Sequence, residues 1–188
     1  MPNFTKAAIK ASFLKLLNER PLNQITVKDI VEDCGINRNS FYYHYQDLPS
    51  LIEEIIHEET DRIINEYPAI DSIEQCLNVA VRFALDNKRA VLHLYNSVNR
   101  SMYERHVMSA CEYVVTTYID GNFPKENVDP EDRDIIIRFY KCACFGQIVD
   151  WMTGGMKTDI CEQFHRLCEL RKGMAEELYR RCTEKNKK

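Results

Sequence analysis

Apolar residues recur at helical spacing along most of the chain. Over residues 5–20, Ile9, Phe13 and Leu17 follow one another at intervals of four, so we expect a helix with a single apolar face. The lysines of this segment lie mostly off that face. Pro21 blocks continuation of the helix, which should end at about residue 20.

Two short helices are predicted next from capping signals. Thr26 suits an N-cap and Asp29 follows three residues later, so a helix should begin here. Gly35 stands where a helix end or a tight turn needs a positive φ. Asn37 can cap a further helix of about two turns, over residues 38–45. Two short helices that meet at a glycine turn, after a longer helix, are the plan of a helix-turn-helix motif. The second helix of that motif enters the major groove of DNA.

Helical phase divides the aromatic run "FYYHY", residues 41–45, into two sets. Phe41 and Tyr45 are four residues apart and share a face with Ile36, so we expect them to pack inward. Tyr42 and Tyr43 project elsewhere, His44 lies near the helix end, and all three should be exposed.

The rest of the chain is also helical in pattern. The last two apolar runs are joined by "TGGMK", a connection short enough to make them antiparallel neighbours. Six glycines and six prolines in 188 residues favour long helices, and the predicted fold class is all-α. We expect a turn-rich loop at 120–130. After the first three helices, the expected helical segments are 47–67, 71–86, 88–97, 101–119, 131–152 and 158–182.

Charge is distributed unevenly along the chain. The net charge is −4, but residues 1–50 hold six Lys/Arg and five Asp/Glu, which gives +1 for the first part and −5 for the remainder. Contact of the first part with a polyanion must therefore rely on the placement of charges rather than on a strong field. No apolar run reaches the roughly 18 residues that cross a bilayer. The first residues also lack the long apolar segment of a signal peptide. We expect a cytoplasmic protein with no membrane contact.

The segment "ITVKDIVEDCGINRNSFYYHYQDLPSLIEEI" resembles the N-terminal signature of TetR-family transcriptional regulators. The shared features are a Thr-led helix, a Gly-Ile turn, a polar trio and an aromatic run before a fresh helix. The resemblance covers about residues 5–55. One position departs from it: where the family usually has a lysine that commonly touches a phosphate, this chain has Leu48, followed by Pro49.

The resemblance implies a homodimer that binds an operator of near-twofold symmetry. Residues 1–46 would form the helix-turn-helix domain, and residues 47–188 would dimerise and sense a small-molecule effector. The family mostly represses transcription. Two other classes stay open: a TetR-like module that acts through a protein partner with weak or no DNA binding, and a small helical enzyme. In the family, the last two helices form the dimer interface as a four-helix bundle, although an intramolecular core would use the same residues. The residues assigned to that interface are Ile137, Cys144, Phe145, Ile148, Trp151, Phe164 and Leu167.

The predicted recognition helix carries the residue types that read DNA. Arg38 can bridge guanine and Asn39 can bridge adenine, whereas Tyr42 and His44 suit sugar-phosphate or a thymine methyl group. Other residues suit phosphate contact or the capping of the helices that make it. A solvated helix face with incidental aromatics is the alternative. These further DNA-binding candidates are Thr26, Lys28, Asn37, Ser40 and Tyr43.

A ligand pocket would need apolar walls with a few polar groups. The segments between about 51 and 119 supply such side chains, although a plain helical core would use the same ones. No ligand identity follows from them. The candidates are Phe83, Leu92, Tyr95, Tyr103, His106, Cys111 and Tyr113.

Cysteine usage does not point to disulfides, metal or redox chemistry. The eight cysteines are scattered through apolar helical segments, and we read them as small buried residues. Cys161, His165 and Cys168 share one helix face, and Cys142 or Cys144 could add a ligand for zinc or copper(I). Packing explains the same pattern, and we expect no metal and no cofactor. Phosphate-binding and hydrolase motifs are missing, and the Glu-Glu pairs at 53–54, 58–59 and 176–177 look like solvated faces, so we expect no enzyme.

Overall fold

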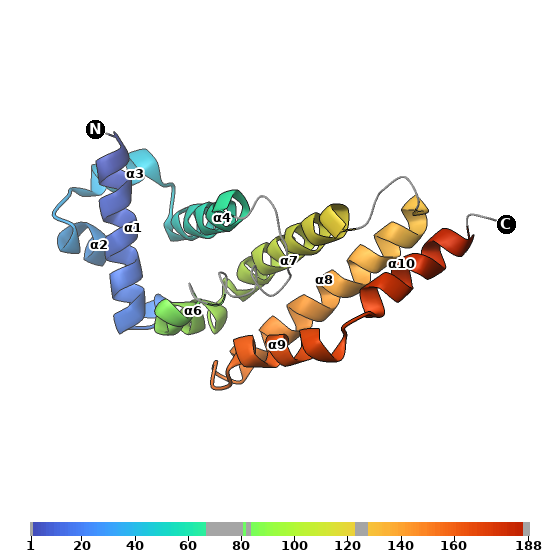
Figure 1. Cartoon of the computed structure of the whole chain (residues 1–188). Coiled ribbons are helices and arrows are strands. Elements are labelled where there is room, and N and C mark those ends of the chain that lie inside the picture. Colours follow the sequence, from blue (N-terminus) through green and yellow to red (C-terminus); the bar gives the residue numbers. More distant parts are fainter. Residues whose placement is uncertain (1, 67–80, 82–83, 123–127, 186–188) are drawn as a thin grey trace. The chain divides into compact units, whose positions relative to one another are not determined.

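We analysed a computed structural model of the chain, which describes residues 2–66, 81, 84–122 and 128–185. Within those ranges every regular element is a helix, which confirms the predicted all-α class (Figure 1). The chain divides into two compact units. The head unit comprises Met1–Asp61 and Ala84–His106, and the body unit comprises Arg62–Phe83 and Val107–Lys188. We had expected the division between residues 46 and 47. The head is larger because parts of later helices complete its core.

The head unit is built around one continuous apolar core. The stripe predicted for residues 5–20 is buried, with Ile9, Phe13 and Leu17 almost fully covered. Leu51 and Ile52 join the same core, so the first turns of the fourth helix belong to the head. A 3₁₀ turn that the pattern did not predict, Leu22–Gln24, follows the first helix. The helices of the head are α1 (Pro2–Glu19), α2 (Val27–Asp33), α3 (Arg38–His44), the first part of α4 (Leu48–Glu66), and α6 (Lys88–Tyr95).

The C-terminal end of α1 is joined to α6 by polar contacts. The Asn18 side chain accepts a hydrogen bond from the backbone N–H of Ala90 (3.2 Å), in the first turn of α6. The His93 ring nitrogen Nδ1 lies 2.7 Å from the Leu17 carbonyl, near the end of α1. Each helix therefore satisfies a backbone group that the other helix end leaves without an intrahelical partner. These contacts fix α1 against the rest of the head.

The body unit has a second core, whose residues come from α7 and α8. Its buried centre contains Cys111, Val115 and Ile119 from α7, and Ile137 and Cys144 from α8. Two ion pairs link α7 to α8, between Arg133 and Asp120 (2.6 Å) and between Lys141 and Glu112 (2.8 Å). The helices are α7 (Arg100–Asn122), α8 (Pro130–Thr153), α9 (Ile160–Leu170) and α10 (Met174–Lys185).

The segment 158–182, which we expected to be one helix, is two. Gly173 adopts φ +83°, a conformation outside the right-handed helical range, and it separates α9 from α10. Apolar spacing alone did not reveal the break because Gly173 lies within a run of otherwise helix-compatible residues. After the short connection, α9 and α10 run back alongside α8 as expected (Figure 1), and the Trp151 indole N–H donates to the Thr158 carbonyl (2.9 Å) across the connection.

Several residues assigned to the dimer interface lie in the interior of a single chain. Ile137, Cys144, Trp151 and Phe164 are buried within the protomer. A surface that docks a second copy needs exposed side chains, so these four serve the intramolecular core that we had weighed as the alternative. Phe145, Ile148 and Leu167 are partly buried, and their place in an interface stays a prediction.

The cysteines are less uniformly buried than expected. Cys111, Cys144 and Cys182 are buried, but Cys142 and Cys168 are exposed. Burial raises the pKa of Cys111 to about 12 and that of Cys144 to about 11, so both remain thiols at neutral pH. Within the part of the chain that the structure describes, no three His, Cys, Asp or Glu residues are grouped so as to hold a metal ion, and no helix is long and apolar enough to span a bilayer.

Candidate nucleic-acid interface

The first cap of the helix-turn-helix is formed as predicted. Asp29 donates its backbone N–H to the Thr26 Oγ1 atom (3.3 Å), and the Asp29 carboxylate accepts the Thr26 backbone N–H (2.8 Å). This reciprocal pair is a capping box that fixes the start of α2. Hydrogen bonds from the Thr26 hydroxyl and backbone lower the pKa of Asp29 to about 2.

Gly35 makes the turn between α2 and α3. It adopts φ +69°, as the sequence predicts, and the N–H of Ile36 donates back to the Val31 carbonyl (3.0 Å). That bond is typical of a helix that ends on a left-handed glycine. Ile36 then packs against the head core, so the turn has a fixed direction.

The recognition helix α3 is capped at one end and anchored along one face. The Asn37 side chain accepts the backbone N–H of Ser40 (2.8 Å), which confirms the predicted cap. Phe41 and Tyr45 are buried, with their ring centres 5.7 Å apart. The inward phase of these two rings is confirmed.

The opposite side of α3 is open to solvent. Arg38 and Asn39 are exposed, as are Tyr42 (53%) and Tyr43 (82%). His44, which we had expected to be exposed, is half-buried, and its ring meets Tyr43 edge-on with centres 5.0 Å apart. We call these five side chains the reading face. A two-turn helix that exposes an Arg, an Asn and two phenols offers both hydrogen-bond groups and flat apolar surface to base edges.

Three other DNA-binding candidates already serve the helix ends. The Thr26 hydroxyl donates to Asp29 (2.6 Å), and the Ser40 hydroxyl donates to the Asn37 side chain (3.1 Å). Since a hydroxyl has a single hydrogen, a phosphate contact by either would have to replace an internal bond. Contact of Thr26, Asn37 and Ser40 with DNA stays a prediction.

Most cations in the first 50 residues are neutralised by nearby carboxylates. Among the described residues, Arg38 has no carboxylate partner, whereas the other five Lys and Arg side chains each have one within 4 Å. Lys28 and its partner are both well exposed, so Lys28 can still turn towards a phosphate. The pairs are Lys6–Glu54 (2.9 Å), Lys10–Glu54 (2.6 Å), Lys15–Asp33 (2.5 Å), Arg20–Asp29 (3.1 Å) and Lys28–Glu32 (3.6 Å).

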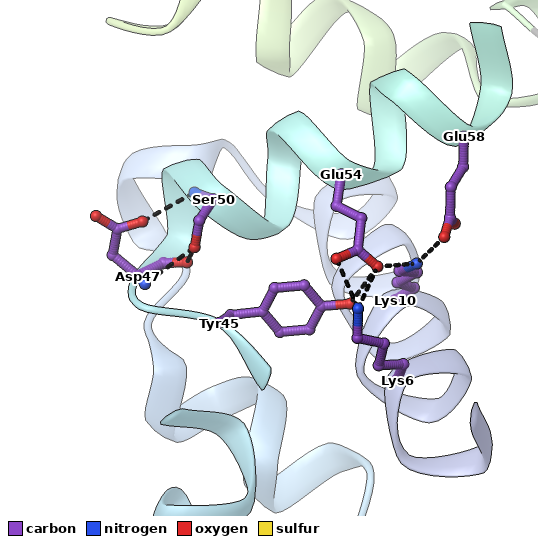
Figure 2. Close-up of polar contacts among 7 residues, drawn as sticks. All are labelled: Lys6, Lys10, Tyr45, Asp47, Ser50, Glu54 and Glu58. Carbon is purple, nitrogen blue, oxygen red and sulfur yellow. Dashed lines mark hydrogen bonds and ion pairs between the residues drawn. The ribbon is translucent and has the colours of Figure 1, made fainter. Parts of the chain in front are cut away.

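The start of α4 lacks the phosphate contact that a lysine would supply. Leu48 is partly buried and packs against the head core, so its side chain is directed away from solvent. Asp47 accepts the backbone N–H of Ser50 (2.8 Å), and Ser50 Oγ accepts the N–H of Asp47 (3.1 Å), which caps the helix internally (Figure 2). Pro49 has no N–H to donate.

A polar cluster that the sequence did not predict joins α1, α3 and α4. The Glu54 carboxylate accepts from Lys6, from Lys10 and from the Tyr45 hydroxyl (3.2 Å), and Lys10 also reaches Glu58 (Figure 2). We had read Glu54 as part of a solvated face, but it is half-buried. Its lysine partners are 48 and 44 residues away, so no local spacing could reveal it. We call these five residues the Glu54 network.

The residues assigned to a ligand pocket belong to both units. Tyr95 is fully buried, and its hydroxyl accepts from the Arg100 guanidinium (2.6 Å), while Cys111 lies in the body core. Burial raises the pKa of Tyr103 to about 12 and lowers the pKa of His106, which leaves both groups neutral at physiological pH. Phe83 lies outside the described residues. A pocket formed by Leu92, Tyr103, His106 or Tyr113 stays a prediction.

Comparison with known proteins matches both parts of the chain to one family. The model described as "Bacterial regulatory proteins, tetR family" matches residues 11–55. The TetR model described as "Transcriptional regulator C-terminal region" matches residues 71–173, more than half of the chain.

Individual proteins similar to this chain include another regulator and a solved structure. It is 38% identical over 58 residues to the "Uncharacterized HTH-type transcriptional regulator YxbF" of Bacillus subtilis (strain 168), over 31% of this chain and only 15% of that protein. The solved structure of the "Dihydroxyacetone kinase operon activator DhaS" aligns with a TM-score of 0.73 and 18% identity, over 88% of this chain and 93% of that chain. The second likeness shows a shared fold.

The Glu54 network should make the stability of the protein pH-dependent. Burial alone would raise the pKa of Glu54 from 4.5, but hydrogen bonds from Lys10 and Lys6 outweigh it and lower the pKa to about 2. A carboxyl whose pKa is lower in the folded than in the unfolded protein stabilises the folded state at pH values above its unfolded-state pKa. This contribution is lost as the pH falls from about 4.5 towards 2. In urea unfolding, Glu54→Gln should be less stable than wild type by about 1 kcal/mol at pH 7, and the gap should narrow below about pH 4. A gap that stays constant down to pH 3 would contradict this assignment.

Proposed function

Because the chain belongs to the TetR family of bacterial regulatory proteins, we propose that it is a DNA-binding transcriptional regulator that reads a pseudo-palindromic operator as a homodimer. The observation that carries the proposal is the reading face: exposed Arg38, Asn39 and Tyr42 on a short helix that is capped, turned and anchored by its own unit. No catalytic role is part of the proposal, and a cytoplasmic location stays a prediction.

Arg38 and Asn39 are assigned to base edges, and the other side chains of the reading face to the DNA backbone and thymine methyl groups. Among the cations of the first 50 residues, Arg38 has no carboxylate partner within the described residues. Its guanidinium can therefore make a bidentate contact with one guanine. Lys28 and Tyr43 are exposed and suit phosphates. With the remaining cations paired, sequence-independent attraction to DNA should be weak.

A second copy of the chain would dock on the exposed side of α8. Ile135, Phe139, Cys142 and Gly146 follow one another at intervals of four, three and four residues, so they share one helix face. Ile135 is 56% and Phe139 is 66% exposed, and this face lies opposite the buried side of the same helix. Leu170 and Met174, at the junction of α9 and α10, are exposed as well. A twofold dimer would cover such apolar side chains.

Dimerisation supplies the symmetry that the operator requires. A single head reads one half-site, and two heads held at a fixed distance read two half-sites about one helical turn apart. We propose that operator occupancy represses transcription. A small molecule would release the protein from the operator if it bound more tightly to a conformation in which the two heads are at the wrong distance for DNA. The shift between the two conformations can be no larger than the difference in the ligand's affinity for them. The name of DhaS describes an activator of a kinase operon, so a reporter assay must record changes in both directions.

The DNA-reading role is tested by selecting operators from a random duplex pool and then replacing Arg38 with alanine. Loss of a two-point contact to guanine should weaken binding to the selected operator by at least tenfold and relax the preference at one base pair in each half-site. Lys15→Ala is the control, because Lys15 is paired with Asp33 and is not part of the reading face, so its loss should change affinity less than threefold. Failure of the wild-type protein to retain any duplex would favour the partner-binding alternative.

The interface is tested by Phe139→Glu. A carboxylate in the middle of the apolar α8 face should leave a monomer of about 22.1 kDa, where the wild type should have twice that mass by light scattering. The variant should also lose most of its operator affinity, because one head alone makes half of the contacts. Val98→Glu is the matched control, since Val98 is an exposed apolar residue of the head and should leave the mass unchanged. A dimeric Phe139→Glu variant would place the interface elsewhere.

A further inference from the structure

Glu54 binds three hydrogen-bond donors from two other elements of the head. Its carboxylate lies 2.9–3.0 Å from the Lys6 ammonium, 2.6 Å from the Lys10 ammonium and 3.2 Å from the Tyr45 hydroxyl (Figure 2). Lys6 and Lys10 are one turn apart on α1, and Glu54 lies in the second turn of α4. One half-buried side chain therefore fixes α4 to α1 and to the end of α3.

Tyr45 connects this carboxylate to the recognition helix. Its backbone N–H donates to the Phe41 carbonyl (2.9 Å), so it is the C-cap of α3. Its ring is buried beside Phe41 and below the Lys6 ammonium, which lies 5.5 Å from the ring centre. Burial, together with the negative charge of Glu54, raises the pKa of the Tyr45 hydroxyl above its usual range, so it stays a donor. A change in the position of Glu54 would act directly on the C-cap residue of α3.

The other end of α1 is also held, by Asn18 and His93 against α6. The lysines that bind Glu54 therefore project from a helix that is fixed within its own unit. The apolar packing of Leu51 and Ile52 holds the same part of α4 against the core. Apolar contacts tolerate sliding better than hydrogen bonds do, because a hydrogen bond weakens steeply away from its preferred distance and angle.

We propose that Glu54 is a positioning residue for DNA reading, which sets the orientation of α3 on α4 by binding the Tyr45 hydroxyl between two lysines of α1. The inference rests on the proposed DNA-binding function. Two-point recognition of a base needs side chains held to within about 0.5 Å and 10–20°. A helix of two turns reaches that precision only if both of its ends are fixed, and the hydrogen bond from the Tyr45 hydroxyl to Glu54 fixes the C-terminal end.

A positioning role for Glu54 and a purely electrostatic effect of its charge predict opposite changes in DNA affinity. Removing a carboxylate near the DNA-binding head raises the net charge by one, and this alone should strengthen binding to a polyanion. A positioning role requires the opposite result for Glu54→Gln. Glu58→Gln is the matched control, since it makes the same charge change one turn later on α4, at an exposed residue that binds Lys10 but not Tyr45.

The experiment measures affinity for the selected operator and for an unrelated duplex, together with melting temperature. Tyr45→Phe, Glu54→Gln, the double variant and Glu58→Gln are compared with wild type at a temperature where all are folded. We expect Tyr45→Phe and Glu54→Gln each to lose about 5- to 20-fold in operator affinity. The double variant should bind the operator no more weakly than whichever single variant has the lower affinity. Affinity for the unrelated duplex should stay within twofold of wild type, and Glu58→Gln should bind the operator as well as wild type or better.

Three outcomes would overturn the inference. Unchanged operator affinity in Tyr45→Phe and Glu54→Gln would show that α3 does not depend on this contact. Additive losses would show that the two residues act separately. Parallel losses for both duplexes, together with a lower melting temperature, would show a purely structural role. If wild type itself binds no duplex, the proposed function fails and the inference fails with it, whereas normal wild-type binding with unaffected variants refutes the inference alone.

Discussion

A recognition helix of seven residues cannot keep its shape in water without help. Isolated helices shorter than about 12 residues are marginal, because the unfavourable nucleation of the first turn is spread over too few hydrogen bonds. The ability of the head to present a DNA-reading helix therefore depends on the tertiary contacts that anchor α3. Asn37 fixes its first turn, Phe41 fills the core beneath it, and Tyr45 fixes its end. With the inner face fully used for anchoring, the outer face is free to carry Arg38 and its neighbours.

The cations of the head are also divided between structural contacts and a side chain left exposed for DNA. Five of the six cations in the first 50 residues bind carboxylates of the described residues, and all of these except Lys28 pair with a carboxylate on another helix. This arrangement lowers general attraction to DNA, and the inward position of Leu48 removes a further contact. A protein built in this way relies on few, well-placed contacts, and its preference for one sequence over another should be large relative to its overall affinity.

Local signals were enough to predict the head but not its internal connections. The caps at Thr26 and Asn37, the turn at Gly35 and the phase of the rings follow from residues at most four apart, and all are confirmed. The lysine contacts of Glu54 and the joint between α1 and α6 link residues 44 or more positions apart, so no periodicity could reveal them. In the body, a buried stripe and an interface stripe look alike in sequence. Ile137 and Trp151 turned out to face inward, whereas Ile135 and Phe139 face solvent.

The most direct test of the central claim is a crystal structure of the protein bound to a duplex recovered by selection. We expect two copies of the chain, with each α3 in a major groove, the Arg38 guanidinium within hydrogen-bonding distance of a base edge, and the Tyr45 hydroxyl still bound to Glu54. A complex in which α3 lies outside the groove, or in which Arg38 reaches only phosphates while other elements contact the bases, would contradict it.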